Sequence, residues 1–244
     1  MGAEPVASQV VARDRLGALL GAFAVLGGTM ERVALDVRLG QRTECGELLE
    51  PFASGQKGSS SMPHKRNPIL CERIAGLARL LRGYAVVGFE NAPLWEERDI
   101  SHSSAERVAV PDAFCAIYYM ARTLRRVVEG LEVRADRMRA NLESTGGLVF
   151  SQRLLLALVD AGMSRDDAYR RVQAHALAAV TGGDGFRARV AADPDLRARL
   201  GDELEACFAL EPLARHWGEL FERGLEAARH GGGERMAGTA TVRR

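Results

Sequence analysis

The segment from Gly55 to Pro68 is the part of the chain whose residue types and spacing could carry out chemistry. It holds serine hydroxyls, a histidine, an asparagine and the only two lysines in the sequence, Lys57 and Lys65. Hydroxyls can take part in proton transfer when cations lie nearby, and cations together with amides bind carboxylates. A solvated Gly-Ser linker would explain the glycines and serines. It does not explain the run Met-Pro-His-Lys-Arg-Asn-Pro at 62–68.

Long helices are expected on both sides of this segment. Over 12–38, apolar residues recur at steps of three and four, which predicts one helical stripe that packs in a bundle. The same spacing predicts helices over 70–84 and 104–131, joined by a polar turn. Prolines and glycines predict a long loop over 50–68. The two helices that flank this loop would therefore position its reactive side chains.

Glycines and capping residues mark packing and boundaries. Gly17 and Gly21 form a small-residue pair in the first helix, which predicts close contact with a neighbouring helix of a soluble bundle. After a helix at 148–160, Gly162 predicts a stop and Ser164 a restart. We therefore expect a domain boundary near Gly162.

The expected fold class is all-α, since no strand-like alternation of convincing length is present. The expected division is a partial central helical bundle over 1–161 that carries the loop at 55–68, and a smaller helical domain over 162–229. The tail at 230–244 is rich in glycine and ends in arginines, which predicts disorder.

Composition excludes several classes of function. A formal net charge of +1 leaves no excess for holding a nucleic acid. The longest uncharged stretch, 16–30, is too short for the roughly 20 residues of a membrane span, so we expect a cytoplasmic protein. The four cysteines are far apart and lack zinc or redox spacing, so we expect buried thiols and no metal site.

The loop from Gly58 to Pro68 resembles the signature loop of the fumarase/aspartase superfamily. Its ending, His-Lys-Arg-Asn-Pro at 64–68, is similar to the end of this loop in the adenylosuccinate lyase family. The segments at 41–44, 94–107 and 150–153 are similar to the same family, and the resemblance runs in continuous order over 9–223. A muconate cycloisomerase shares more of the loop than other relatives do, but it lacks the segment Glu-Arg-Asp-Ile-Ser-His-Ser-Ser at 97–104.

The resemblance implies an all-α bundle of long helices of the fumarase/aspartase type plus a smaller C-terminal helical domain. It implies a homotetramer whose active sites each draw segments from three subunits. The implied reaction is β-elimination of fumarate from a purine nucleotide, either adenylosuccinate, which gives AMP, or the succinylocarboxamide ribotide of purine biosynthesis. No cofactor is implied.

The resemblance also assigns site residues. The general base falls on Ser59, with Ser60 as a substrate contact and the alternative base. Lys65, Arg66 and Asn67 would contact the succinyl group, and Lys65 would stabilise the serine anion. Further substrate contacts fall outside the loop. Gln9 would contact the substrate. The nucleotide, chiefly its phosphate, would be held by Arg73, Arg98, Ser104 and Arg107.

Family members carry an N-terminal domain before the point that resembles Gln9, and two histidines that serve as the general acid and its partner. We therefore expect this chain to be the C-terminal portion of such an enzyme and to be inactive by itself. Two alternatives stay open. One is another lyase or cycloisomerase of the superfamily, and the other is a non-catalytic helical assembly module that keeps the loop by descent.

Overall fold

The structure is a computed structural model, and it describes residues 6, 11–52, 62, 65–96 and 99–230. Contacts divide the chain into two compact units, Met1–Asn141 and Leu142–Arg244. The expected all-α class is confirmed, because the described residues form helices apart from two strands of two residues each.

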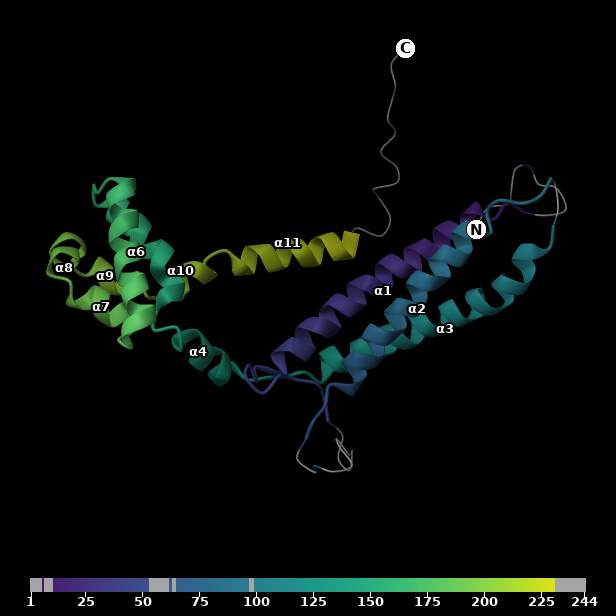
Figure 1. The fold of residues 1–244 in the computed structure, drawn as a ribbon, viewed down its shortest axis with the longest axis horizontal. Coiled ribbons are helices and arrows are strands. Elements are labelled where there is room, and N and C mark those ends of the chain that lie inside the picture. The colour runs from purple at the N-terminus through teal and green to yellow at the C-terminus, as the bar shows by residue number, and fades with distance from the viewer. Residues whose placement is uncertain (1–5, 7–10, 53–61, 63–64, 97–98, 231–244) are drawn as a thin grey trace, which may run out of the picture. The chain divides into compact units, whose positions relative to one another are not determined.

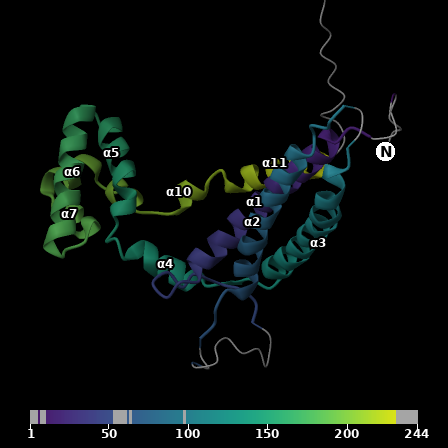
Figure 2. The same ribbon diagram turned by 45° about the vertical axis from the view of Figure 1, so that its right-hand side comes forward.

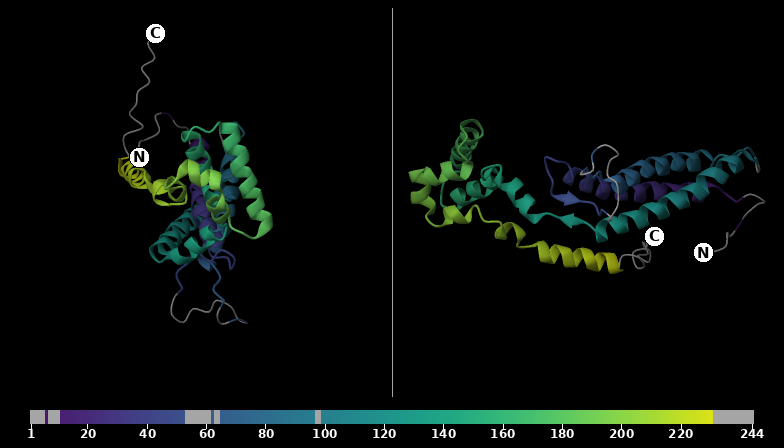
Figure 3. Two further views of the ribbon diagram at one scale, coloured as in Figure 1. Left: turned by 90° about the vertical axis from the view of Figure 1, so that its left-hand side faces the viewer. Right: turned by 90° about the horizontal axis from the view of Figure 1, so that it is seen from below.

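Three long helices build the first unit: α1 (Asp14–Gly40), α2 (Ile69–Glu90) and α3 (Ser101–Glu129). They lie side by side in all views, with α2 antiparallel to the other two (Figures 1, 2 and 3). α1 and α3 match the expected ranges to within three residues at each end, and α2 extends further than expected, to Glu90. A fourth helix, α4 (Ala135–Glu143), was not expected, because none of its residues is buried and it therefore has no apolar stripe.

The bundle core consists of apolar side chains from all three helices. Leu20, Ile74, Leu81 and Met120 are almost fully buried in it. α1 and α2 approach closely at the glycines, since a Cβ atom added to Gly17 would lie 2.9 Å from the carbonyl oxygen of Gly88. The predicted close contact at Gly17 is therefore confirmed, and the small-residue pair belongs to packing within the bundle.

A short antiparallel pair joins the end of α3 to the start of the loop. In it, β1 (Leu48–Leu49) pairs with β2 (Glu132–Val133), with Leu48 opposite Val133. Next to the pair, the Arg134 N–H donates to the Glu47 carbonyl over 2.9 Å. The pair fixes the chain that enters the loop against the chain that leaves α3.

The second unit consists of helices, all but the last two of which contribute side chains to its own core. They are η1 (Leu148–Phe150), α5 (Ser151–Asp160), α6 (Arg165–Gly182), α7 (Phe186–Ala192), α8 (Pro194–Leu200), α9 (Glu203–Ala206), α10 (Glu211–Ala214) and α11 (Trp217–His230). Phe186, Leu154 and Leu158 are fully buried in the core. Ser164 caps α6, as expected, by accepting the Asp167 N–H over 3.1 Å.

The division between the units lies at Asn141 and Leu142 rather than near Gly162. The reason is that α5, which was expected to end the bundle, packs against α6. Its buried residues Leu154 and Leu158 belong to the core of the second unit. At the other end of this unit, helix α11 extends to His230, and residues 231–244 lie outside the described residues.

Among the described helices, α1 is the one that is long and apolar enough to cross a membrane. Length and composition alone are weak evidence, because a core helix of a soluble protein has the same properties. Its glycine face packs against α2, which accounts for part of its apolar surface. Other apolar residues of α1 are exposed, among them Val25, Leu26, Leu35 and Leu39.

Candidate active site

The described part of the signature loop forms one wall of a pocket at the end of the bundle where α1 stops. The pocket has a volume of about 640 Å³. Lys65, Arg66 and Asn67 line it from the loop side, and Arg38 and Arg42 line it from the end of α1. Four cations therefore face one acidic lining residue, Glu72. A pocket with this charge balance favours an anionic ligand with more than one negative group.

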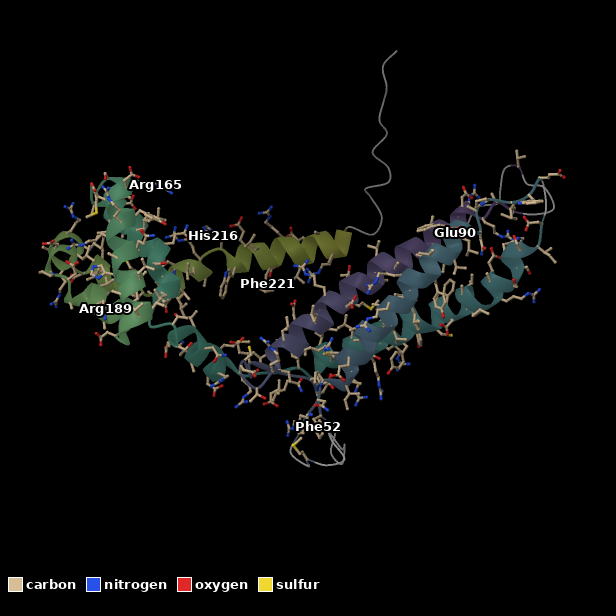
Figure 4. The ribbon with its side chains drawn as sticks, viewed as in Figure 1. Phe52, Glu90, Arg165, Arg189, His216 and Phe221 are labelled. Atoms are coloured by element: carbon tan, nitrogen blue, oxygen red, sulfur yellow. The ribbon has the colours of Figure 1, made fainter. Side chains whose placement is uncertain are left out.

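Arg66 is held by an aromatic ring at the base of the loop. Its guanidinium carbon lies 5.1 Å from the centre of the Phe52 ring, and Nη1 lies 4.0 Å from an oxygen of Glu132. Half of the side chain is exposed, so the ion pair is weak and the guanidinium can still bind a carboxylate. Phe52 is labelled at this end of the bundle in Figure 4.

Arg73 lies one turn into α2 and is exposed. Its Nη1 donates to the Tyr119 hydroxyl of α3 over 3.4 Å. The backbone of α2 thus places Arg73 near the loop end, on the outside of the bundle, and not in the wall of the pocket.

Ser104 and Arg107 lie at the first turns of α3, at the opposite end of the bundle. Ser104 Oγ donates to the Ser101 carbonyl over 3.4 Å, whereas Arg107 Nε donates to the hydroxyl of Ser103, also over 3.4 Å. The two residues that were expected to hold the phosphate thus lie within one turn of each other at the start of α3, and Ser103 lies on the same helix face as Arg107.

Asp99 orders the chain that enters α3. Its carboxylate accepts the N–H groups of Trp95 and Ser101, each over 2.8 Å, and a short hydrogen bond from the Ser101 hydroxyl. These bonds, led by the Ser101 hydroxyl, lower the pKa of Asp99 to about 2. Sequence reasoning did not select Asp99 as a site residue, although a carboxylate just before a helix is a common capping signal.

The loop cluster and the α3 cluster cannot meet within one chain. α2 has 22 residues, so the two ends of the bundle are separated by roughly 33 Å. Figure 4 shows this separation, with Phe52 labelled at one end of the first unit and Glu90 at the other. A single copy therefore presents two separate candidate half-sites, one basic at the loop and one with serine and arginine at α3.

The other predicted site residues, Gln9, Ser59, Ser60 and Arg98, lie outside the described residues. In the described part of the chain, no three His, Cys, Asp or Glu side chains converge as a metal site would require. The chemistry that the described geometry supports is the binding of anions by fixed cations and amides.

Two family models and several known proteins are similar to this chain. Residues 147–224 match the family model "Adenylosuccinate lyase C-terminus", and residues 1–83 match the model "Lyase". The chain is 51% identical over 223 residues to the adenylosuccinate lyase of Deinococcus radiodurans and 45% identical over 221 residues to that of Thermotoga maritima. These matches cover 91% and 90% of this chain and 51% of each relative. The chain thus spans about half the length of the curated relatives it matches.

A solved structure, the 3-carboxy-cis,cis-muconate lactonizing enzyme from Pseudomonas putida, has the same arrangement of helices. Its TM-score is 0.73 at 33% identity, over 80% of this chain and 44% of that chain. The long-helix bundle with its signature loop is thus that of a protein of the fumarase/aspartase superfamily. Within that superfamily, the chain belongs to the adenylosuccinate lyase family.

Proposed function

We propose that this chain contributes to an adenylosuccinate lyase, which eliminates fumarate from adenylosuccinate to give AMP and carries out the same elimination on the succinylocarboxamide ribotide. The observation that carries the proposal is the pocket at the loop base, where Lys65, Arg66 and Asn67 face the end of α1. A succinyl group has two carboxylates, and this pocket supplies cations for both. Identity of about half with curated adenylosuccinate lyases supports the same substrate class.

The reaction needs a base and a separate acid. Ser59 removes the proton from the carbon next to a carboxylate, and the electron pair forms the new carbon–carbon double bond as the carbon–nitrogen bond breaks. The leaving nitrogen gains a proton from the acid, so that fumarate and the nucleotide product are released. Lys65 stabilises the serine anion and the charge that develops on the carboxylate. Ser60 contacts substrate and is the alternative base.

The nucleotide is bound by residues outside the loop. Arg73, Arg98, Ser104 and Arg107 hold its phosphate, and Gln9 contacts the substrate. Guanidinium groups and hydroxyls at a helix start suit a phosphate, since the backbone N–H groups there point toward the ligand. The general acid is supplied from outside these 244 residues.

A homotetramer would reunite the two half-sites. They lie at opposite ends of α2, so only other copies of the chain can bring an α3 cluster to a loop pocket. The exposed apolar residues of the long helices are available for such an assembly. Each complete active site then contains segments of three subunits. We place this soluble enzyme in the cytoplasm.

The test is cleavage of adenylosuccinate, followed by ultraviolet absorbance. The chain is assayed alone and mixed with a separately expressed N-terminal half of the Deinococcus radiodurans relative. We expect turnover only in the mixture, and its loss in Ser59→Ala with substrate binding retained. Turnover by Ser59→Ala would move the base to Ser60 or elsewhere.

The remaining outcomes separate the alternatives. Turnover by the chain alone would place the general acid within it. A mixture that assembles by light scattering but cleaves no adenylosuccinate would favour a non-catalytic assembly module. Cleavage or cyclisation of a different dicarboxylate would favour another lyase or cycloisomerase of the superfamily.

A further inference from the structure

A single amide side chain joins the two ends of the signature loop. Gln41 follows the last residue of α1. Its Oε1 accepts the N–H of Glu50, where the chain enters the loop, over 2.9 Å. Its Nε2 donates to the carbonyl oxygen of Arg66, where the chain leaves the loop, over 2.9 Å. Because one partner can only donate and the other can only accept, the amide has one orientation.

Glu50 makes a second connection across the loop base. The residue is 3% exposed, and its carboxylate accepts the N–H of Leu70 over 3.1 Å and that of Cys71 over 3.2 Å. These N–H groups belong to the first turn of α2, where backbone donors lack helical partners and favour a negative charge. Pro68, the residue that precedes α2, makes no side-chain cap. Glu50 therefore caps α2 from the other end of the loop.

The environment of Cys71 agrees with a buried carboxylate at this position. Burial, together with the charge and hydrogen bond of Glu50, raises the pKa of the Cys71 thiol to about 12. The thiol therefore stays protonated and does not compete with Glu50 as an anion for the helix start.

We propose that Gln41 and Glu50 are positioning residues that hold Lys65, Arg66 and Asn67 in place at the mouth of the pocket. The Gln41 side chain binds the main chain at Arg66, and the Glu50 side chain binds it at Leu70 and Cys71, so the two fix the path of the loop end relative to α1 and α2. Neither group contributes to the apolar core of the bundle. The kinetic part of this inference rests on the proposed lyase function, and the structural part does not.

The two lysines allow a direct test on the 244-residue chain. Because Lys57 and Lys65 are the only lysines, a lysine-specific protease can cut only within the loop. Cleavage reports the population of the opened segment when opening is fast. Gln41→Met keeps the side-chain length and removes both hydrogen bonds. We expect it to raise cleavage after Lys65 about tenfold relative to cleavage after Lys57, with little change in melting temperature.

Two variants of Glu50 and one control variant extend the same cleavage assay. Glu50→Ala removes every acceptor for the α2 N–H groups and should raise the same ratio about tenfold, whereas Glu50→Gln keeps one acceptor oxygen and should raise it less. Gln173→Met makes the same chemical change as Gln41→Met at an exposed position on α6 and should leave the ratio unchanged. An unchanged ratio in Gln41→Met would overturn the proposal. So would equal acceleration at both lysines with a matching fall in melting temperature, since that is the behaviour of residues that only stabilise the fold.

The kinetic arm uses the mixture with the N-terminal half of the relative. Gln41→Met should lower kcat about tenfold or more with a smaller change in KM, because misplaced groups lose transition-state contacts. An unchanged kcat in Gln41→Met would overturn the positioning role. If the unsubstituted mixture has no turnover, the proposed function fails, while the cleavage ratio still decides whether Gln41 and Glu50 hold the loop base.

Discussion

Arg171 and Asp193 form a two-point ion pair inside the second unit. Nε of Arg171 donates to Oδ2 over 3.0 Å, and Nη2 donates to Oδ1 over 2.9 Å. The Asp193 side chain is only 7% exposed, and it also accepts the N–H groups of Asp195 and Leu196 over 2.9 and 3.3 Å. One carboxylate therefore caps α8 and joins it to α6.

Removal of this carboxylate should destabilise the second unit. Asp193→Ala loses a helix cap and leaves Arg171 without its main partner, so we expect the free energy of unfolding to fall by roughly 2–3 kcal/mol. Asp195→Ala is the matched control, since Asp195 is exposed and pairs with Arg171 at the surface; its cost should be below about 0.5 kcal/mol. Urea unfolding measures both, and equal losses would contradict the role given to Asp193.

The same carboxylate makes stability depend on pH. Burial would raise the pKa of Asp193, but hydrogen bonds from Arg171, His175 and two backbone N–H groups outweigh it and lower the pKa from 3.8 to about 2. The folded state therefore binds fewer protons than the unfolded state in this range. The stabilisation reaches its full value above about pH 5, past the unfolded pKa of 3.8, and is lost as the pH falls toward 2.

Comparison with an uncharged variant tests this dependence. The difference in unfolding free energy between the chain and Asp193→Asn should be constant above about pH 5 and should shrink as the pH falls toward 2. A difference that does not change with pH would mean that the pKa of Asp193 is the same in the folded and unfolded states.

A second ion pair joins the starts of α1 and α3. Nε of Arg13 lies 2.8 Å from Oε1 of Glu106, and Nη2 lies 2.7 Å from Nε2 of His102, with the Arg13 and Glu106 side chains largely shielded from solvent. Arg13→Met should therefore cost about 3 kcal/mol, because it leaves a shielded carboxylate unpaired. The exposed pair of Arg125 and Glu129 provides the control, and Arg125→Met should cost below about 0.5 kcal/mol. Urea unfolding decides, and a cost for Arg13→Met as small as that of the control would show that the pair is solvated.

The sequence was sufficient to predict the elements of the bundle. The steps of three and four located α1, α2 and α3, because each helix buries one apolar stripe. The pattern stopped at Tyr84, before the end of α2, because the residue that packs against α1 further along is Gly88, which adds nothing to an apolar stripe. The division between the units was also displaced, since nothing in the α5 sequence says which of two cores its leucines join.

The candidate site was predictable in its residue types but not in its arrangement. The run at 62–68 drew attention to Lys65, Arg66 and Asn67, which the structure brings to one pocket. The distance from that pocket to Arg107 depends on α2 and α3 running antiparallel, and the sequence motifs do not show the directions of the helices. Gln41 lies in the family-like segment 41–44, but neither it nor Glu50 was given a role, because single polar residues that bind main-chain atoms produce no repeat or spacing.

Close helix contact makes the glycines of α1 and α2 sensitive to substitution. A Cβ atom at Gly17 would lie 2.9 Å from the Gly88 carbonyl oxygen, and this backbone cannot move away without separating the helices. Gly17→Ala should therefore lower the free energy of unfolding by about 1–3 kcal/mol. Gly83→Ala, on α2 with nothing within 4 Å of the added atom, should instead raise it by about 0.5–1 kcal/mol. Thermal melts compare the two, and losses of the same size in both would remove the packing explanation.

The long helices leave more apolar surface exposed than a solitary bundle needs, and this surface should drive self-association. Val25 in α1 is 73% exposed, and Leu26, Leu35 and Leu39 on the same helix are also exposed. A charge placed among them would be buried without a partner in any assembly that covers α1, so Val25→Arg should weaken association roughly tenfold or more. Val180→Arg makes the same change at a 69% exposed position of α6 and should leave association unchanged. Light scattering across a dilution series measures both, and equal effects would place the contact between copies away from α1.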